Sequence, residues 1–163
     1  GIDRKLAKVV LLATMYGQGT TGLAGRIGKS EKQAGSIRRD MLRSMPESAK
    51  WMNKVGQIAE QFKKVPTAGG RILAVDASFR AVNYMVQGSA YDVLAHTICE
   101  MKRRRISDQL YLAMHDEVVV STTVAAEVRD IMQTPPPWLT RAAGRVPVLR
   151  TDMEHMGSSW QKV

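Results

Sequence analysis

The sequence predicts an α+β fold in which a helical part precedes a long helix and a small antiparallel sheet. Apolar residues recur at helical spacing through residues 1–65. A Gly-Gly pair between short β-prone runs follows at 66–75, and two more β-prone runs flank a polar tripeptide within 110–122. We therefore expect one helical subdomain at 1–65 and a second subdomain at 66–163.

Four helices are expected in the first part. Asp3 is a plausible N-cap for the first of them, and Thr20 and Thr21 can cap the second. Ser30 and Gln33 have the spacing of a capping box in front of the third. The expected ranges are 3–15, 22–27, 31–44 and 46–63.

The second part is expected to hold a hairpin or extended connector at 66–75, a long helix, a tight hairpin, two short helices and a last strand. The basic run Lys102–Arg105 suits the C-terminus of the long helix, where cations stabilise the helix dipole. A phosphate contact is the second interpretation of this run. After the connector, the expected ranges are 77–105, 110–114 with 118–122, 125–132, 138–143 and 146–153.

Composition excludes several classes of protein. With 163 residues, 44% hydrophobic and 24% charged, the chain has enough apolar material for a folded core, which argues against disorder. The single cysteine, Cys99, excludes an intramolecular disulfide, and its apolar neighbours predict a buried thiol in a reducing compartment such as the cytoplasm. The apolar run Val9–Met15 is too short to span a bilayer, so no membrane partner is expected.

The positive charge is concentrated in the first part. Of the net +9, residues 1–65 carry +8, from 13 Lys+Arg against 5 Asp+Glu, and residues 66–163 carry +1. A basic helical surface favours nucleic acid, nucleotide phosphates or anionic lipid as a partner. A solvated helix face rich in Lys and Arg is the alternative.

The first candidate site is a ridge of four residues spaced by four, Arg4, Lys8, Leu12 and Tyr16. Two cations, an apolar side chain and an aromatic ring in a row suit a triphosphate followed by a sugar and a base. On this pattern alone, an ordinary amphipathic helix with solvated cations is the commoner explanation.

The second candidate site is Asn83-x3-Gln87-Gly88 on the long helix. Amides one turn apart share a helix face and can donate hydrogen bonds to base-edge or sugar acceptors. Gly88 permits close approach of another backbone or a nucleic-acid strand. A polar helix edge, or amides satisfied by backbone groups, is the simpler alternative.

The third candidate site is His115-Asp116-Glu117 between apolar strands. An exposed turn favours Asn-Gly or Asp-Gly, so the absence of glycine is mild support for a role of Asp116 and Glu117 beyond the turn. A carboxylate on a rigid hairpin is a good ligand for Mg²⁺, which binds through one or two carboxylates and substrate phosphates. A solvated acidic turn explains the motif equally well.

Taken in order, these motifs resemble family A DNA polymerases, the DNA polymerase I-like group. The stretch Thr67-x-Gly-Gly-Arg71 is similar to the family's connector between fingers and palm, and the sequence from Val146 to near Trp160 is similar to its last strand. The resemblance covers essentially the whole chain. It implies that residues 1–65 are fingers-like and that residues 66–163 form part of a palm, with short connectors similar to those of a compact phage-type enzyme.

The resemblance implies roles for the first two sites. Arg4 and Lys8 correspond to cations that hold the phosphates of the incoming dNTP, with Lys8 placed to protonate the departing pyrophosphate. Tyr16 corresponds to the aromatic residue that packs against the nascent base pair. Asn83 and Gln87 correspond to residues that contact the minor groove of primer-template DNA.

The resemblance also implies roles for the third site. His115 corresponds to a residue near the primer terminus. Asp116 corresponds to one of two catalytic aspartates that bind Mg²⁺, and Glu117 to its less essential catalytic neighbour. Two metal ions need two suitably placed carboxylates, and the second is not recognisable in this chain.

Three positions depart from the family pattern. Leu12 stands where Phe or Tyr is usual, which alters sugar discrimination and stacking. Phe79 stands where an Arg is common, and the adjacent Arg80 is the candidate replacement for a DNA contact. Tyr91 replaces a small residue.

The first catalytic aspartate of the family lies before the fingers helix, and this sequence contains no counterpart. We therefore expect the C-terminal portion of a template-directed DNA polymerase, inactive without the missing N-terminal segment, with primer-template DNA and dNTP as further partners. The alternative is a non-catalytic DNA-binding accessory module derived from a polymerase. A third interpretation is a basic helical domain with no nucleotide chemistry.

Overall fold

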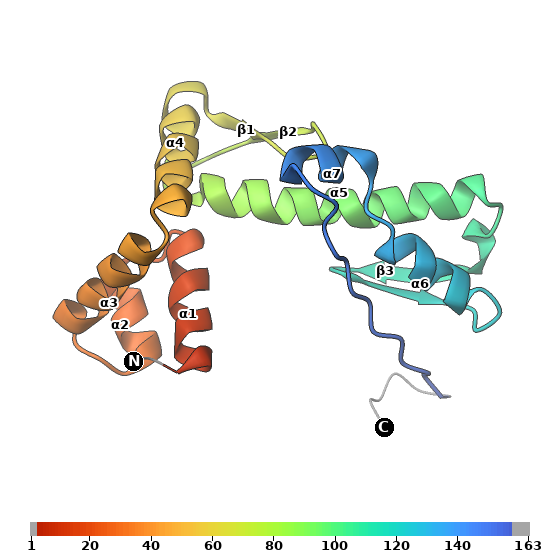
Figure 1. Ribbon diagram of the computed structural model, residues 1–163, viewed down its shortest axis with the longest axis horizontal. Coiled ribbons are helices and arrows are strands. Elements are labelled where there is room, and N and C mark those ends of the chain that lie inside the picture. The colour runs from red at the N-terminus through yellow and green to blue at the C-terminus, as the bar shows by residue number, and fades with distance from the viewer. Residues whose placement is uncertain (1–2, 158–163) are drawn as a thin grey trace. The chain divides into compact units, whose positions relative to one another are not determined.

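The structure is a computed structural model, and it describes residues 3–157. Within this range it confirms the α+β class, because helices dominate and the strands form two separate two-stranded antiparallel sheets (Figure 1). In chain order the elements are α1 (Arg4–Met15), α2 (Thr20–Ile27), α3 (Glu31–Ser44), α4 (Pro46–Phe62), β1 (Lys64–Pro66), β2 (Ile72–Ala74), the 3₁₀ helix η1 (Ser78–Arg80), α5 (Ala81–Arg103), the 3₁₀ helix η2 (Ser107–Gln109), β3 (Leu110–Met114), β4 (Glu117–Val120), α6 (Ala125–Gln133) and α7 (Pro137–Ala143).

The chain forms two compact units. The first contains the chain up to Thr67 together with Arg71–Gln87, and the second contains Ala68–Gly70 and the chain from Gly88 onward. Helix α5 therefore contributes its first turns to one unit and the remainder to the other. The assignment of 1–65 to fingers and 66–163 to palm stays a prediction.

Two of the predicted helix caps are confirmed. The Asp3 carboxylate accepts a hydrogen bond of 2.8 Å from the Leu6 N–H at the start of α1. At the start of α3, the Ser30 hydroxyl accepts from the Gln33 N–H at 3.3 Å, and the Gln33 side chain accepts from the Ser30 N–H at 3.1 Å. Each bond satisfies a backbone donor that has no partner within its helix.

The predicted cap of α2 is wrong. Thr20 lies inside the helix, and Gly19 is the N-cap, with extended backbone and no side-chain hydrogen bond. A residue can cap only from the non-helical position before the first turn. Since Gly19 already occupies that position, Thr20 and Thr21 cannot act there.

Two apolar clusters hold the first unit together. One lies among the first three helices, and the other joins α4 to the β1–β2 hairpin and the start of α5. The buried members of the first cluster are Val10, Ala13, Leu23, Ala24 and Ala34. The buried members of the second are Val55, Ala59, Val65, Val75, Ala81 and Val82.

The segment at 66–75 contains the turn and second strand of a hairpin, one of the two forms that the sequence predicts there. Strands β1 and β2 pair antiparallel, with Val65 opposite Leu73. At the tip, the Thr67 N–H donates to the Arg71 carbonyl at 2.7 Å, and the Arg71 N–H donates to Thr67 Oγ1 at 3.0 Å. These bonds close a short turn around the two glycines.

The long helix begins later than predicted. Residues Ser78–Arg80 form the 3₁₀ turn η1, and regular α5 starts only at Ala81. Asp76 stabilises this irregular start, because its carboxylate accepts from the Ala77 N–H and from the Arg80 side chain. Phe79 consequently lies outside the apolar stripe of the helix and is 59% exposed.

The second unit is built around the C-terminal part of α5. Its core consists of Met101 from α5 with Val128 and Ile131 from α6, and residues of the β3–β4 hairpin pack against it. In this hairpin Met114 lies opposite Glu117, and the register shifts between Leu110 and Leu112. The predicted tight hairpin is therefore confirmed.

The predicted last strand at 146–153 is wrong. The segment has no regular structure and no strand partner within residues 3–157, and Val146 and Val148 are 70% and 81% exposed. A β-prone sequence forms a strand only where a neighbouring strand supplies hydrogen bonds. The part of this prediction that reached Trp160 lies outside the described residues.

The predicted burial of Cys99 is also wrong. Cys99 is exposed, although Thr97 and Met101, two positions before and after it, are buried. Residues two apart in an α-helix point about 200° away from each other. Apolar neighbours in the sequence therefore do not place Cys99 on the buried side of α5.

Candidate functional site

Helix α1 presents the predicted ridge on one side of the first unit. Arg4, Lys8 and Tyr16 are exposed, and Leu12 is half-buried. Within the described part of the chain, neither Arg4 nor Lys8 forms an ion pair. Both charges are therefore available to an anionic ligand.

The end of α1 lies against η1 and the start of α5. Gly17 has φ +70°, and a Cβ at this position would overlap the Phe79 carbonyl oxygen and approach its ring to 2.8 Å. One residue earlier, Tyr16 Oη accepts a hydrogen bond of 2.9 Å from Gln87 Nε2. Two side chains that sequence patterns assigned to different sites therefore meet.

Asn83 lies one turn before Gln87 but in a different environment. Asn83 is half-buried, and its Oδ1 atom is shut off from solvent with no hydrogen-bond donor among residues 3–157. An unsatisfied buried acceptor costs roughly 1–3 kcal/mol. Gln87 is exposed, so its side chain is more accessible than that of Asn83.

Arg80 is held by its neighbours. Its guanidinium contacts the Asp76 carboxylate at 2.6 Å and lies over the Phe79 ring at 5.5 Å. Partial desolvation raises the pKa of Asp76, but the hydrogen bond from Tyr84 and the charge of Arg80 outweigh it and leave this pKa below its ordinary value. Arg80 can contact a DNA phosphate only after its ion pair with Asp76 is broken.

The third predicted site occupies the turn of the β3–β4 hairpin. His115 and Asp116 are the two turn residues, and His115 adopts φ +54°. This left-handed conformation costs a residue with a side chain about 1–2 kcal/mol. Lys63 and Arg105 also have positive φ, so this backbone conformation does not by itself mark a functional position.

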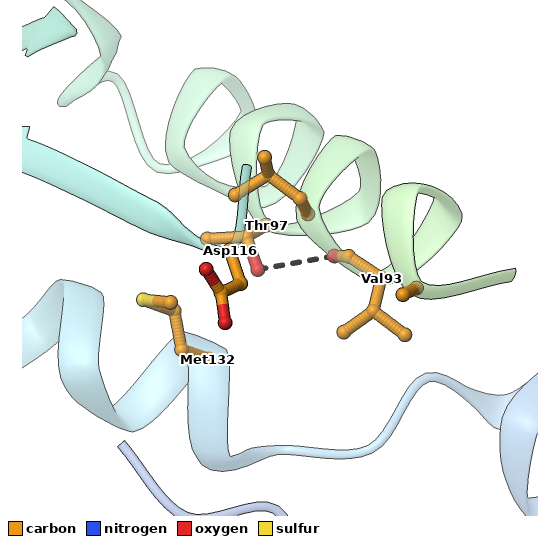
Figure 2. A pocket seen from close by; sticks show the side chains of 6 residues that line it. Val93, Thr97, Asp116 and Met132 are labelled. Carbon is orange, nitrogen blue, oxygen red and sulfur yellow. Dashed lines mark hydrogen bonds between the residues drawn. The ribbon is translucent and has the colours of Figure 1, made fainter. Parts of the chain in front are cut away.

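The Asp116 side chain faces a small cavity between α5, which carries Val93 and Thr97, and α6, which carries Met132 (Figure 2). The cavity measures about 80 Å³ and is mostly apolar. The Thr97 hydroxyl is already bonded to the Val93 carbonyl at 3.2 Å. Within the described residues the Asp116 carboxylate has no hydrogen-bond or ion-pair partner, so its oxygens are available to a ligand.

Among the described residues, Asp116 is the only carboxylate that lines this cavity, and the other lining residues are Thr97 and apolar side chains. A carboxylate with free oxygens is a suitable ligand for Mg²⁺, which keeps several waters and takes substrate phosphates. However, no group of three or more His, Cys, Asp or Glu side chains in the described chain could hold a metal. Asp116 can therefore be one ligand, and Glu117, exposed at the start of β4, is its nearest acidic neighbour in sequence.

Two residues that the sequence did not assign to a site fix the connector to α5. The Ala68 N–H donates to Ser89 Oγ at 2.8 Å, and a Cβ on Gly69 would lie 2.5 Å from Asp92 Oδ2. Ser89 and Asp92 thus position the hairpin tip within the second unit.

A larger cavity of about 310 Å³ lies elsewhere in the second unit, between the end of α5 and the chain after α6. Glu100 lies there between His96, at 3.6 Å, and Arg103. Burial of the imidazole and the nearby charge of Arg103 lower the pKa of His96.

Within residues 3–157 no helix combines the length and apolar character needed to cross a bilayer.

The sequence matches the family model of DNA polymerase family A over residues 2–162. It is 29% identical over 140 residues to the DNA polymerase of Mycobacterium phage L5. This alignment covers 81% of this chain and 24% of the phage protein. It is 28% identical over 174 residues to DNA polymerase I of Bacillus caldotenax. This alignment covers 96% of this chain and 20% of that polymerase.

A solved structure shows the same fold. The POL domain of Pol1 from M. smegmatis, in complex with DNA primer-template and dNTP, superposes with a TM-score of 0.66 at 21% identity, covering 89% of this chain and 28% of that one. The chain spans about a fifth to a quarter of the length of these curated relatives. With the match over nearly its whole length, the chain belongs to DNA polymerase family A.

Proposed function

We propose that the chain is the C-terminal portion of a template-directed DNA polymerase and takes part in nucleotidyl transfer within a complete enzyme. The observation that carries this proposal is the hydrogen bond from Gln87 to Tyr16, which joins the end of the nucleotide-binding ridge to the helix expected to contact DNA. Family membership and the order of the three motifs support it.

The α1 ridge receives the triphosphate of the incoming dNTP in this proposal. Arg4 and Lys8 contact its phosphates, because both cations are exposed and have no ion pair with another described residue. Lys8 also donates a proton to the departing pyrophosphate when the primer 3′-hydroxyl attacks the α-phosphate. Leu12 packs against the sugar, and Tyr16 packs against the nascent base pair.

The first turns of α5 contact the primer-template. Gln87 donates to minor-groove acceptors, which every correct base pair presents. Asn83 joins this contact by donating from its Nδ2 atom. Arg80 contributes once its ion pair with Asp76 is exchanged for a phosphate.

The hairpin turn supplies the acidic part of the site. Asp116 would hold Mg²⁺ through its free carboxylate oxygens, with Glu117 in a secondary catalytic role and His115 near the primer terminus. When bound, the ion would neutralise phosphate charge and lower the pKa of the attacking hydroxyl. Positioning by the remaining side chains supplies much of the rate enhancement.

An upstream polymerase segment completes the site in this proposal, because a second carboxylate is needed and the 163 residues offer no recognisable one. Residues 1–65 then act as fingers and residues 66–163 as part of the palm. The place of action is the cytoplasm, where bacteria and their phages replicate DNA.

A non-catalytic DNA-binding accessory module is the second candidate function. It is favoured by the concentration of net charge +8 in residues 1–65. Such a module would bind DNA through many distributed cations, with strong salt dependence. Its DNA binding would survive both Lys8→Ala and Asp116→Ala.

Primer extension with and without an upstream polymerase segment supplied in trans tests the proposal. We expect synthesis only in the combined sample, and we expect Asp116→Asn to abolish it. Asp152→Asn, which changes an exposed carboxylate in the irregular tail, is the matched control and should leave synthesis intact. Robust synthesis by the 163 residues alone, sensitive to Asp116→Asn, would disprove the need for a second segment.

A further inference from the structure

Phe79 is an exposed aromatic residue next to the end of α1. The sequence has only two phenylalanines, and the Phe79 ring is 59% exposed at the 3₁₀ turn before α5. Only the covered part of the ring contributes hydrophobic stabilisation to the fold. The exposed part of the ring is therefore accessible to a ligand.

The neighbours of Phe79 hold the ring in place. Its carbonyl and one ring edge lie against Gly17, where any side chain would overlap them. The Arg80 guanidinium lies over the ring at 5.5 Å and forms an ion pair with Asp76 at 2.6 Å. A ring fixed in advance loses little conformational freedom when a ligand packs on it.

The surroundings of the ring suit a nucleic-acid base. Tyr16, adjacent to Gly17 in the chain, presents a second accessible aromatic side chain, and its hydroxyl is bonded to the Gln87 amide. Aromatic side chains beside cations form the usual binding surface for single-stranded nucleic acid, because every base has a π-face that stacks. The net charge of +8 in residues 1–65 attracts the phosphate backbone.

We propose that Phe79 is a stacking surface for an unpaired base of a nucleic-acid strand. This inference rests on the proposed function and deepens it, because it assigns Phe79 a contact with an unpaired base of the nucleic acid. Stacking tolerates any base, so the site recognises the unpaired state and not the sequence.

A primer-template with a single-stranded template overhang, carrying 2-aminopurine at each unpaired position in turn, tests this inference on the 163-residue chain. Stacking quenches 2-aminopurine fluorescence, and anisotropy of a distant dye reports total binding. We expect the wild-type chain to quench at one unpaired position. Phe79→Ala and Phe79→Leu should remove the quench and weaken binding roughly 5- to 100-fold, whereas Phe79→Trp should retain both.

Phe62 provides the matched control, because it is the other phenylalanine and is 54% exposed at the end of α4. Phe62→Leu should leave quench and affinity unchanged. Binding by anisotropy with no quench at any unpaired position, or an unchanged quench in Phe79→Leu, would overturn the stacking role and leave the polymerase proposal standing. Absence of both signals at low salt would overturn the stacking role and count against DNA binding by this chain as well.

Discussion

Gln87 Nε2 donates a hydrogen bond of 2.9 Å to Tyr16 Oη, across 71 residues of sequence. The bond joins the C-terminal end of α1 to the first turns of α5 within the first unit. Both side chains are exposed, so water competes for each partner and the net contribution to stability is small, about 0.5–1 kcal/mol. A weak, accessible bond can exchange readily for contacts with a ligand.

The first prediction concerns this bond. Tyr16→Phe removes the acceptor and should lower the free energy of unfolding by at most about 1 kcal/mol. Gln87→Ala removes the donor, and the double variant should lose less than the sum of the two single variants, because they share one bond. Urea denaturation measures all three, with Tyr111→Phe, 69% exposed, as the control. Strict additivity would show that the bond is absent in solution.

The second prediction concerns the close approach at Gly17. Gly17→Ala must adopt φ +70° and also meets the Phe79 carbonyl, so we expect a loss of roughly 3 kcal/mol or more. Gly28→Ala has a similar φ of +64° with no atom within 4 Å, and should lose only about 1–2 kcal/mol. Thermal and urea unfolding compare the two. Equal losses would mean that η1 moves away from α1 at no cost.

The local features of the fold were predictable from sequence because their determinants are local. The Ser30–Gln33 capping box and the start of α4 at Pro46 depend on a few adjacent residues, and both are found as expected. The prediction at Thr20 failed because Gly19 could also take the N-cap position. Sequence patterns alone did not distinguish these two candidates.

The tertiary features were less predictable. Tyr16 and Gln87 were each identified as candidates, but their contact depends on Gly17 packing against Phe79, which no helical periodicity encodes. The strand expected at 146–153 failed for a related reason, because strand formation requires a partner elsewhere in the chain. The prediction of a hairpin around Asp116 was correct, because the two strands of a hairpin are adjacent in sequence and pair with each other.

The third prediction concerns the connector tip. A methyl group at Gly69 would lie 2.5 Å from Asp92 Oδ2 and 2.9 Å from its Cγ, and Asp92 is buried on α5. Gly69→Ala should therefore displace the tip and lower stability by about 1–3 kcal/mol. Hydrogen exchange of the Ala68 amide, which donates to Ser89, should become faster.

Gly56→Ala is the control for this experiment. Gly56 lies inside α4, and a methyl group there meets no atom within 4 Å. Alanine in a helix interior is favoured over glycine by about 0.8–1.0 kcal/mol, so this variant should be more stable than wild type. Unchanged stability and amide exchange in Gly69→Ala would place the tip away from Asp92.

The fourth prediction is a pH dependence of stability at His96. Burial and the charge of Arg103 lower the pKa of His96 in the folded chain below its ordinary value of 6.5. The unfolded chain therefore binds the proton more tightly. The stabilising contribution is fully present above pH 6.5 and is lost as the pH falls through the lowered folded pKa.

Urea unfolding between pH 5 and pH 8 measures this effect. His96→Gln should flatten the part of the stability profile below pH 6.5, because the amide does not titrate. His155→Gln, at an exposed position in the tail, should leave the profile unchanged. A His96→Gln profile that falls as steeply as wild type would show that other groups cause the loss.

The fifth prediction separates the role of Lys8 from general basicity. In the complete enzyme, Lys8→Ala should reduce the rate of nucleotide incorporation by about 10²- to 10⁴-fold, the usual contribution of a positioned general acid. DNA affinity should change little, because it is distributed over many cations. Lys5→Ala removes the same charge from an exposed position off the ridge and should change neither quantity strongly. Single-turnover incorporation and DNA anisotropy measure the two quantities, and equal effects of Lys8→Ala and Lys5→Ala on incorporation would rule out a specific contact between Lys8 and the triphosphate.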